Sequence, residues 1–191
     1  MITIGKIRKA FKIIINTMIG YRSPEITYYS QYSLKYFYKP YGQETIGTVG
    51  CGPFACAIVC SSLLQRSISP IEIAKWAYEN GFYEYRHGSY HSLIPTYTQK
   101  MGLKCEDLGD RMDELDRKLN QQNTLAILLC KQKTFATGRH FIVVGKKGSK
   151  MKVYNSGNVL DCYRSFDQQK LKESLAEENI YIGPIWCISK E

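Results

Sequence analysis

Cys51 is the residue whose neighbours best suit nucleophilic chemistry. It follows a glycine-punctuated loop (residues 42–50) and begins an apolar run (residues 51–65) that predicts a buried helix. The unpaired backbone N–H groups at a helix N-terminus carry about half a positive charge, which stabilises a thiolate. We therefore expect the pKa of the Cys51 thiol to be lowered and its sulfur to be a nucleophile near neutral pH. The alternative is a cysteine that only starts a helix.

A thiolate nucleophile needs an imidazole as its general base, and His140 is the best placed of the three histidines. It opens a predicted strand after the polar loop 131–139, so a rigid element would hold it at a sheet edge. His87 and His91 fall in a predicted loop between two helices. The alternative for His140 is a structural histidine whose hydrogen bonds are satisfied inside the fold.

Asn155 is the candidate for the group that orients the imidazole. Gly148-Ser149 predicts the turn of a hairpin, and His140 and Asn155 lie at near-mirror positions on its two strands. We therefore expect these two side chains to meet. Asn155 could instead serve only the turn sequence Asn-Ser-Gly, and Asp161 is a less well-placed substitute.

An acyl-transfer site also needs hydrogen-bond donors for the oxyanion. The backbone N–H of Cys51 is one such donor, and the amide of an upstream glutamine is the usual second. Gln31 and Gln43 are the candidates, and the sequence does not choose between them.

The elements that must position these residues fall into two groups. Helical periodicity comes first, and short apolar runs rich in β-branched residues follow. The predicted helices span residues 5–19, 51–65, 70–80, 91–101 and 111–121, and the predicted strands span residues 124–130, 140–147, 151–157 and 180–189. Helices followed by an antiparallel sheet define the α+β class.

The N-terminal segment differs from the rest of the chain in its charge. Residues 5–19 read as a basic amphipathic helix with an apolar stripe. We interpret residues 1–24 as an appendage and residues 25–191 as one domain. The interpretation that we favour is a helix packed on that domain or frayed before it. A helix that makes weak contact with a membrane surface and a poor signal peptide are the alternatives.

Composition and motifs exclude several classes of protein. The 191 residues carry a net charge of +9, but no helix-turn-helix, zinc-finger or RNP-like pattern occurs, so we expect no nucleic-acid partner. No apolar stretch of about 18 residues is present to form a transmembrane helix. P-loop and GxSxG motifs are absent. The seven cysteines include no CxxC pair, so we expect no metal and no cofactor. Their odd number favours a reducing, cytoplasmic location over secretion.

Three segments of the chain carry a further signal. They are Tyr29-Ser30-Gln31, residues 45–53 (TIGTVGCGP) and residues 138–144 (GRHFIVV). Together they resemble the C39-like cysteine peptidases, which have the papain-like fold, over roughly residues 26–188. GCGP and GRHFIVV are fairly specific as a pair and weak separately. The resemblance implies a nucleophile at Cys51, a general base at His140 and an orienting group at Asn155.

The chain departs from that family's pattern in three places. The family usually has Asp-Pro where this chain has Asn155-Ser156, and leader-peptidase members have a glutamine at the position of Thr45. Gln31 resembles the glutamine of the freestanding members, which have an insertion before the cysteine. Leader peptidases are usually fused to an exporter, and this chain has neither membrane spans nor an ATPase, so a double-glycine leader is not implied as its substrate.

The residues and the resemblance together predict a thiol hydrolase acting through Cys51, His140, Asn155 and Gln31. The bond cleaved would be a peptide or isopeptide amide of a peptide or protein substrate. Two alternatives stay open: a catalytically inactive C39-like binding module, and an acyl transferase that passes the acyl group to an amine in the same site.

Overall fold

A five-stranded antiparallel sheet forms the centre of the molecule. The computed structural model describes residues 4–131, 135, 138–176 and 184–190. The strands follow the order β5-β9-β6-β7-β8. They are β5 (Lys104–Gly109), β6 (Thr124–Lys131), β7 (Arg139–Lys147), β8 (Lys150–Tyr154) and β9 (Ile185–Ser189).

Most of the helices precede the sheet in the chain. They are α1 (Ile4–Met18), α2 (Ile46–Val49), α3 (Cys51–Leu64), α4 (Pro70–Glu79), α5 (Leu93–Lys100), α6 (Met112–Leu119) and α7 (Gln168–Ala176), with a 3-10 helix η1 (Val159–Tyr163) after β8. Two short antiparallel pairs lie in the loops: β1 (Pro40–Tyr41) with β2 (Glu44–Thr45), and β3 (Tyr83–Glu84) with β4 (Gly88–Ser89). Helices followed by an antiparallel sheet confirm the α+β class.

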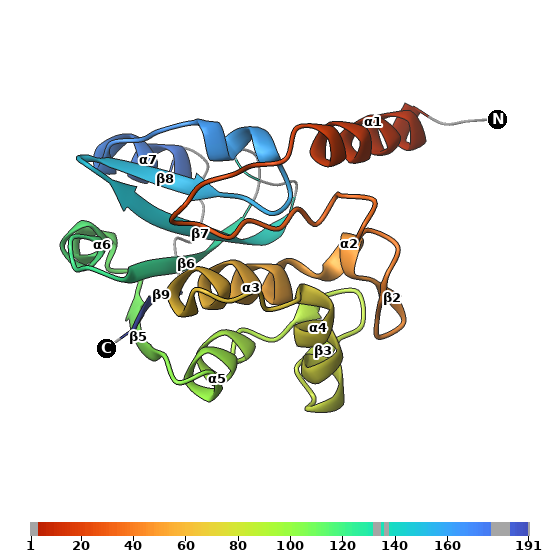
Figure 1. Ribbon diagram of the computed structural model, residues 1–191, viewed down its shortest axis with the longest axis horizontal. Coiled ribbons are helices and arrows are strands. Elements are labelled where there is room, and N and C mark those ends of the chain that lie inside the picture. The colour runs from red at the N-terminus through yellow and green to blue at the C-terminus, as the bar shows by residue number, and fades with distance from the viewer. Residues whose placement is uncertain (1–3, 132–134, 136–137, 177–183, 191) are drawn as a thin grey trace.

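Both faces of the sheet are buried, which explains the unbroken apolar runs of β6 and β7. Successive side chains of a strand point to opposite faces. Leu125, Ile127 and Leu129 pack in one cluster with α3, α4 and α5, whereas Ala126 and Leu128 pack in a second cluster with α6 and α7. Figure 1 shows α3 on one side of β6 and β7 and α7 on the other. A strand with one face in water would show polar residues at alternate positions instead.

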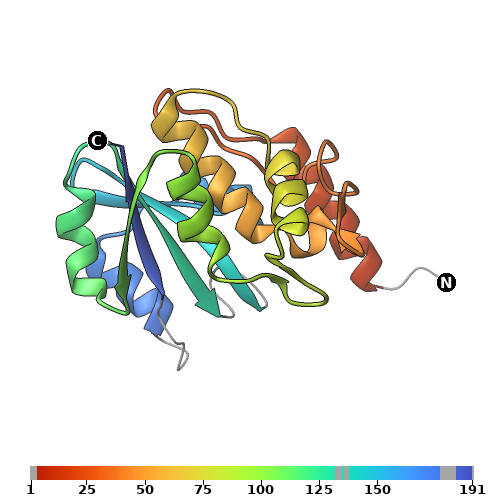
Figure 2. The same cartoon turned by 90° about the horizontal axis from the view of Figure 1, so that it is seen from below.

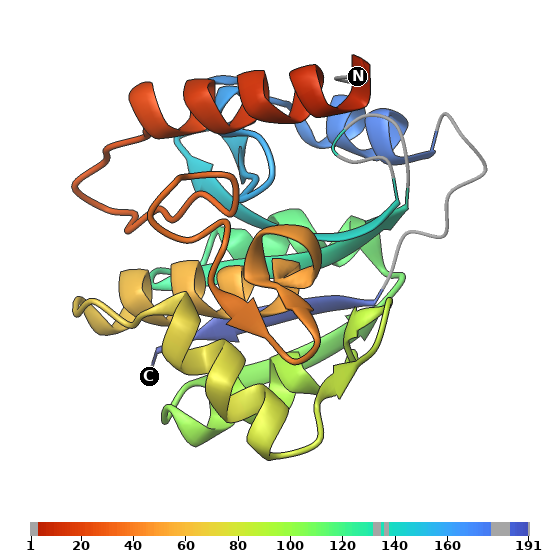
Figure 3. The ribbon, with the colours of Figure 1, turned by 90° about the vertical axis from the view of Figure 1, so that its right-hand side faces the viewer.

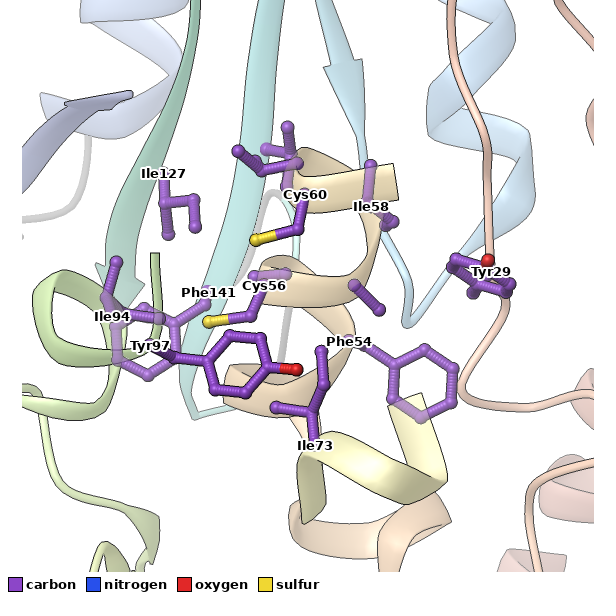
Figure 4. Packing of buried hydrophobic residues seen from close by; sticks show 14 of the residues in the cluster. Tyr29, Phe54, Cys56, Ile58, Cys60, Ile73, Ile94, Tyr97, Ile127 and Phe141 are labelled. Atoms are coloured by element: carbon purple, nitrogen blue, oxygen red, sulfur yellow. The ribbon is translucent and has the colours of Figure 1, made fainter. Parts of the chain in front are cut away.

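Helix α3 is the centre of the first cluster and is buried on nearly every side. Figure 2 shows α3 and α5 side by side across the same face of the sheet. In Figure 4, Cys56 and Cys60 point toward Ile127 of β6, while Phe54 lies on the other side of the helix. Because the sheet and the neighbouring helices hold α3, they also fix the position of its first residue, Cys51.

The predicted helices and strands are present, and most of their boundaries differ from the observed ones by a few residues. Larger differences occur in three segments. The predicted strand 151–157 ends at Tyr154, because Asn155 and Gly157 form a side-chain-supported turn. The loop expected over residues 42–50 contains β2 and α2. The first four residues of the predicted strand 180–189 lie outside the described residues, and β9 begins at Ile185.

Strand β5 and helix α7 have no counterpart among the predicted elements. Strand β5 reads KCEDLG and is an edge strand whose side chains are largely solvated, so it lacks an apolar run. Helix α7 reads QQKLKESLA and has few apolar residues to show a helical period. Both elements owe their structure to packing on the sheet rather than to a local signal.

Candidate active site

His140 and Asn155 are hydrogen-bonded to each other. His140 is the second residue of β7, and Asn155 directly follows β8. Nε2 of His140 and Oδ1 of Asn155 are 2.8 Å apart. The β7–β8 register, Val143↔Tyr154, would place His140 opposite position 157 if it continued, so Asn155 reaches the imidazole diagonally. The expected contact between these two side chains is therefore present.

The hydrogen bonds of the Asn155 amide fix the tautomer of His140. Asn155 Nδ2 donates to the carbonyl oxygen of Phe135 and to Oδ2 of Asp161, at 2.9 and 2.7 Å. Asn155 Oδ1 accepts from the backbone N–H of Gly157 at 2.8 Å. Because an amide oxygen can only accept, His140 Nε2 must carry the proton of the neutral ring. Nδ1 of His140 then has the lone pair that a general base uses.

Gly157 and Asp161 belong to this network, although the sequence suggested no role for Gly157 and suggested Asp161 only as a substitute for Asn155. A Cβ atom at Gly157 would lie 3.2 Å from both Asn155 Oδ1 and His140 Nε2, a tight contact that these side chains would have to shift to relieve. Asp161 lies behind Asn155 instead of replacing it, and burial raises the pKa of its carboxyl group. The turn sequence Asn-Ser-Gly was the available signal for Gly157, but nothing local distinguishes Asp161 from a surface carboxylate.

Of the two candidate glutamines, Gln31 lies in the cavity that contains His140 and Gln43 does not. The Gln31 side chain is buried, and its Nε2 donates to the carbonyl oxygen of Gly47 at 3.1 Å. An amide nitrogen has two hydrogens, so the second can serve an oxyanion. Gln43 is exposed in the turn between β1 and β2 and lines neither of the two cavities near the site.

Two neighbouring cavities flank the start of β7 and share Arg139. The first has a volume of about 510 Å³ and contains Gln31 and His140, with residues of α1 on its wall. The second has a volume of about 390 Å³ and contains Cys51 and Phe141, with residues of the 84–92 segment on its wall. The candidate nucleophile and the candidate base therefore open into adjacent spaces rather than one.

Cys51 begins α3 as expected, but it lines the neighbouring cavity and not the one that contains the imidazole. The sulfur lies near the backbone N–H of Phe141, the residue that follows His140. In the part of the chain that the structure describes, no hydrogen bond joins Cys51 to His140. The structure thus brings His140, Asn155 and Gln31 together and leaves Cys51 next to them.

The expected lowering of the Cys51 pKa is wrong for this conformation. Burial raises the pKa of the thiol, although the backbone N–H groups of Phe141, Gly52 and Cys51 act in the lowering direction. The helix N-terminus does favour the thiolate, but desolvation of the charged form outweighs it.

The pKa of His140 is lowered, which also favours the neutral form of this residue. Burial lowers it to about 4, against the opposite effect of the hydrogen bond to Asn155, and the charge of Lys12 lowers it further. With the Cys51 pKa raised and the His140 pKa lowered, the resting pair near pH 7 is a thiol and a neutral imidazole.

The described residues contain no group of three or more His, Cys, Asp or Glu side chains that could hold a metal ion. None of their helices is both long and apolar enough to cross a bilayer.

Comparison with known proteins gives a match in structure and none in sequence. No protein-family model matches the chain, and no curated protein matches it. The crystal structure of the peptidase domain of Streptococcus ComA, a bi-functional ABC transporter involved in a quorum-sensing pathway, matches 75% of this chain and 93% of its own, with a TM-score of 0.54 and 14% identity. This chain has the fold of a C39 peptidase domain. The papain-like fold expected from the resemblance is thereby confirmed, and at this identity the match concerns the C39 fold alone.

Proposed function

We propose that this chain is a cysteine peptidase-like thiol hydrolase that cleaves a peptide or isopeptide bond. The observation that carries the proposal is the His140–Asn155 hydrogen bond, whose geometry leaves a lone pair on His140 Nδ1. Cys51 lies beside that pair at the N-terminus of a buried helix. The C39 fold, known from a peptidase domain, supports the same function.

The first half of the reaction forms a thioester. Cys51 Sγ bonds to the carbonyl carbon of the substrate while its proton passes to His140 Nδ1 and the carbonyl π electrons move onto oxygen. The backbone N–H of Cys51 and the second amide hydrogen of Gln31 donate to that oxyanion. When the intermediate collapses, the C–N bond breaks and the leaving amine takes the proton from His140.

The second half releases the acid. Water gives a proton to His140 Nδ1 and attacks the thioester carbon, the C–S bond breaks, and the proton returns to the sulfur of Cys51. Asn155 holds the imidazole in one tautomer through both halves, because its amide is fixed by Phe135, Gly157 and Asp161.

Attack requires the Cys51 thiol to come within hydrogen-bonding reach of His140 Nδ1. In the resting state its sulfur lies near the backbone N–H of Phe141, and among the described residues it has no hydrogen bond to His140. Rotation about the single heavy-atom torsion of the cysteine side chain is one movement that would bring the sulfur there. Substrate entry into the Cys51 cavity would favour that movement.

A catalytically inactive binding module is the second candidate function. One observation favours it: Cys51 and His140 are not hydrogen-bonded, and both are neutral in the resting state. In that case the two cavities bind a peptide and Cys51 has no chemical role.

Cleavage of a diverse peptide library, read as new termini by mass spectrometry, tests the proposal. We expect the unmodified chain to produce cleavages that both Cys51→Ala and His140→Ala abolish and that Asn155→Ala reduces. Addition of a primary amine separates a hydrolase from an acyl transferase, because a transferase forms amide adducts with the amine. The same library is also passed over the immobilised chain to find the peptides that bind. If the unmodified chain cleaves nothing, and Cys51→Ala binds the same peptides as the unmodified chain, the binding module is correct and the hydrolase is wrong.

A further inference from the structure

Helix α1 turns its apolar side to solvent, although a helix packed on a globular domain ordinarily turns that side to the core. Its apolar stripe faces solvent, and each of its members is between 50% and 79% exposed. The stripe consists of Ile4, Ile7, Phe11, Ile14 and Met18. The two buried residues of α1 are Ile13 and Asn16, on the opposite side of the helix. A surface helix ordinarily turns its apolar stripe to the core, so this stripe lacks the partner that its composition requires.

Specific polar contacts hold α1 in this orientation. Asn16 is buried, and its Oδ1 accepts from the Ser30 hydroxyl at 3.0 Å and from the backbone N–H of Val159 at 2.9 Å. The Lys12 ammonium lies 4.0 Å from the centre of the Tyr32 ring. A rotation of α1 that buried the apolar stripe would break the hydrogen bonds of Asn16, and unmaking a buried polar pair is costly.

Exposed apolar side chains also occur on segments that contact α1 and the residues after it. Figure 3 shows α1 along the outside of the molecule. Of the thirteen large apolar side chains exposed in the described part of the chain, six lie between residues 4 and 19. Two more are Leu34, whose backbone N–H donates to Thr17, and Tyr163, whose hydroxyl donates to the carbonyl oxygen of Gly20. Such a concentration of exposed apolar side chains marks an interaction surface.

The charge of α1 selects among the partners for this surface. Lys6, Arg8, Lys9 and Lys12 are all on α1, and residues 4–18 contain no aspartate or glutamate. Pairing with a second copy of the same helix would bring these positive charges together. An anionic bilayer instead accepts the apolar stripe in its acyl boundary and the exposed Lys6 and Arg8 side chains at its headgroups. Lys9 and Lys12 lie over the Phe37 and Tyr32 rings and add to the positive charge near that surface.

We propose that the exposed face of α1 docks this chain on an anionic lipid surface, with the helix lying in the plane of the interface. The proposal rests on α1 alone and does not require the proposed hydrolase to be correct. Because Phe11, Lys12 and Asn16 of α1 also line the cavity that contains His140, docking would hold that cavity next to the lipid surface.

The test is co-sedimentation of the full chain with vesicles of phosphatidylcholine alone and of phosphatidylcholine with about a third phosphatidylserine. The variant is Ile7→Ser with Ile14→Ser, which removes two exposed members of the stripe. The matched control is Tyr78→Ser with Tyr85→Ser, which removes two equally exposed side chains elsewhere. Circular dichroism checks that each protein is folded.

We expect the unmodified chain and the control to bind the anionic vesicles, with binding weakened by salt. The Ile7/Ile14 variant should bind at least about tenfold more weakly, since each isoleucine transfers to the apolar phase favourably. Absence of binding to anionic vesicles, or equal binding by variant and control, overturns the proposal. A dimer of the unmodified chain that the Ile7/Ile14 variant loses would assign the face to a second copy and overturn it as well.

Discussion

The titration of His140 tests the geometry of the site directly. Burial holds the pKa of this imidazole at about 4, whereas the ordinary value is 6.5. We therefore expect the proton NMR signal of its ring Cε1–H to titrate with a midpoint near 4 in the folded chain. The chain has three histidines, and the signal that disappears in His140→Gln identifies the one of interest.

The same pKa difference sets a dependence of stability on pH. A histidine whose folded pKa is depressed is protonated in the unfolded chain first, so its contribution to folding is complete above pH of about 6.5 and is lost as the pH falls toward 4. At about 1.4 kcal/mol per pH unit, the loss between pH 7 and 4 is about 3 kcal/mol. Urea unfolding at several pH values should show this loss in the unmodified chain and lack it in His140→Gln.

A midpoint at or above 6.5 would refute this reasoning. It would mean that the imidazole is solvated, or that it forms an ion pair with a Cys51 thiolate, which raises a histidine pKa. A second measurement separates these two cases: Cys51→Ala would return the midpoint toward 4 if a thiolate pair had raised it, and would leave it unchanged if solvent had.

Three further predictions follow from individual contacts. Gly157→Ala should destabilise the fold by about 1–3 kcal/mol in thermal unfolding, because its Cβ would press on His140 and Asn155; Gly138→Ala, where a Cβ meets nothing within 4 Å, is the control and should not. Asp161→Ala should cost about 1–3 kcal/mol in urea unfolding, because it leaves the buried Asn155 amide with one of its two acceptors, the Phe135 carbonyl. Asp161→Asn should cost less, because its side-chain oxygen can replace the lost acceptor. Alkylation of Cys51 by iodoacetamide, followed by mass spectrometry, should keep accelerating above pH 8, since burial raises its pKa; a plateau below about pH 6.5 would show a preformed thiolate instead.

The sequence was sufficient to predict the buried elements of the fold and the contact between His140 and Asn155. The apolar runs of β6, β7 and α3 predicted those elements closely, because each is buried on nearly all sides and its composition reports that burial. The Gly148-Ser149 turn predicted that His140 and Asn155 would meet, and they do. Hairpin pairing is local, so a turn sequence is enough to bring two residues close to its strands together.

The sequence was insufficient where the outcome depends on desolvation or on packing between distant segments. The helix N-terminus lowers the pKa of Cys51 and desolvation raises it. Only the helix N-terminus is a local feature, so it was the only one of the two that the sequence indicated. The position of Gln31, and not Gln43, in the cavity with His140 depends on the pairing of the Gln31 segment with Ser156, more than a hundred residues away. The direction that the α1 stripe faces depends on Asn16, which reads as a polar interruption in an apolar helix.

Asn155-Ser156 stands where the C39-like peptidases that the sequence resembles usually have Asp-Pro, and the carboxylate of Asp161 is hydrogen-bonded to Asn155. The neutral amide of Asn155 orients His140 but offsets little of an imidazolium charge, which agrees with a His140 pKa of about 4. The carboxylate of Asp161 lies on the far side of the Asn155 amide from the ring and also pairs with Arg164. Asn155→Asp alone would place two carboxylates within hydrogen-bonding distance, and such a pair holds a proton between them. Together with Asp161→Asn, the substitution would put an unshared negative charge against the imidazole.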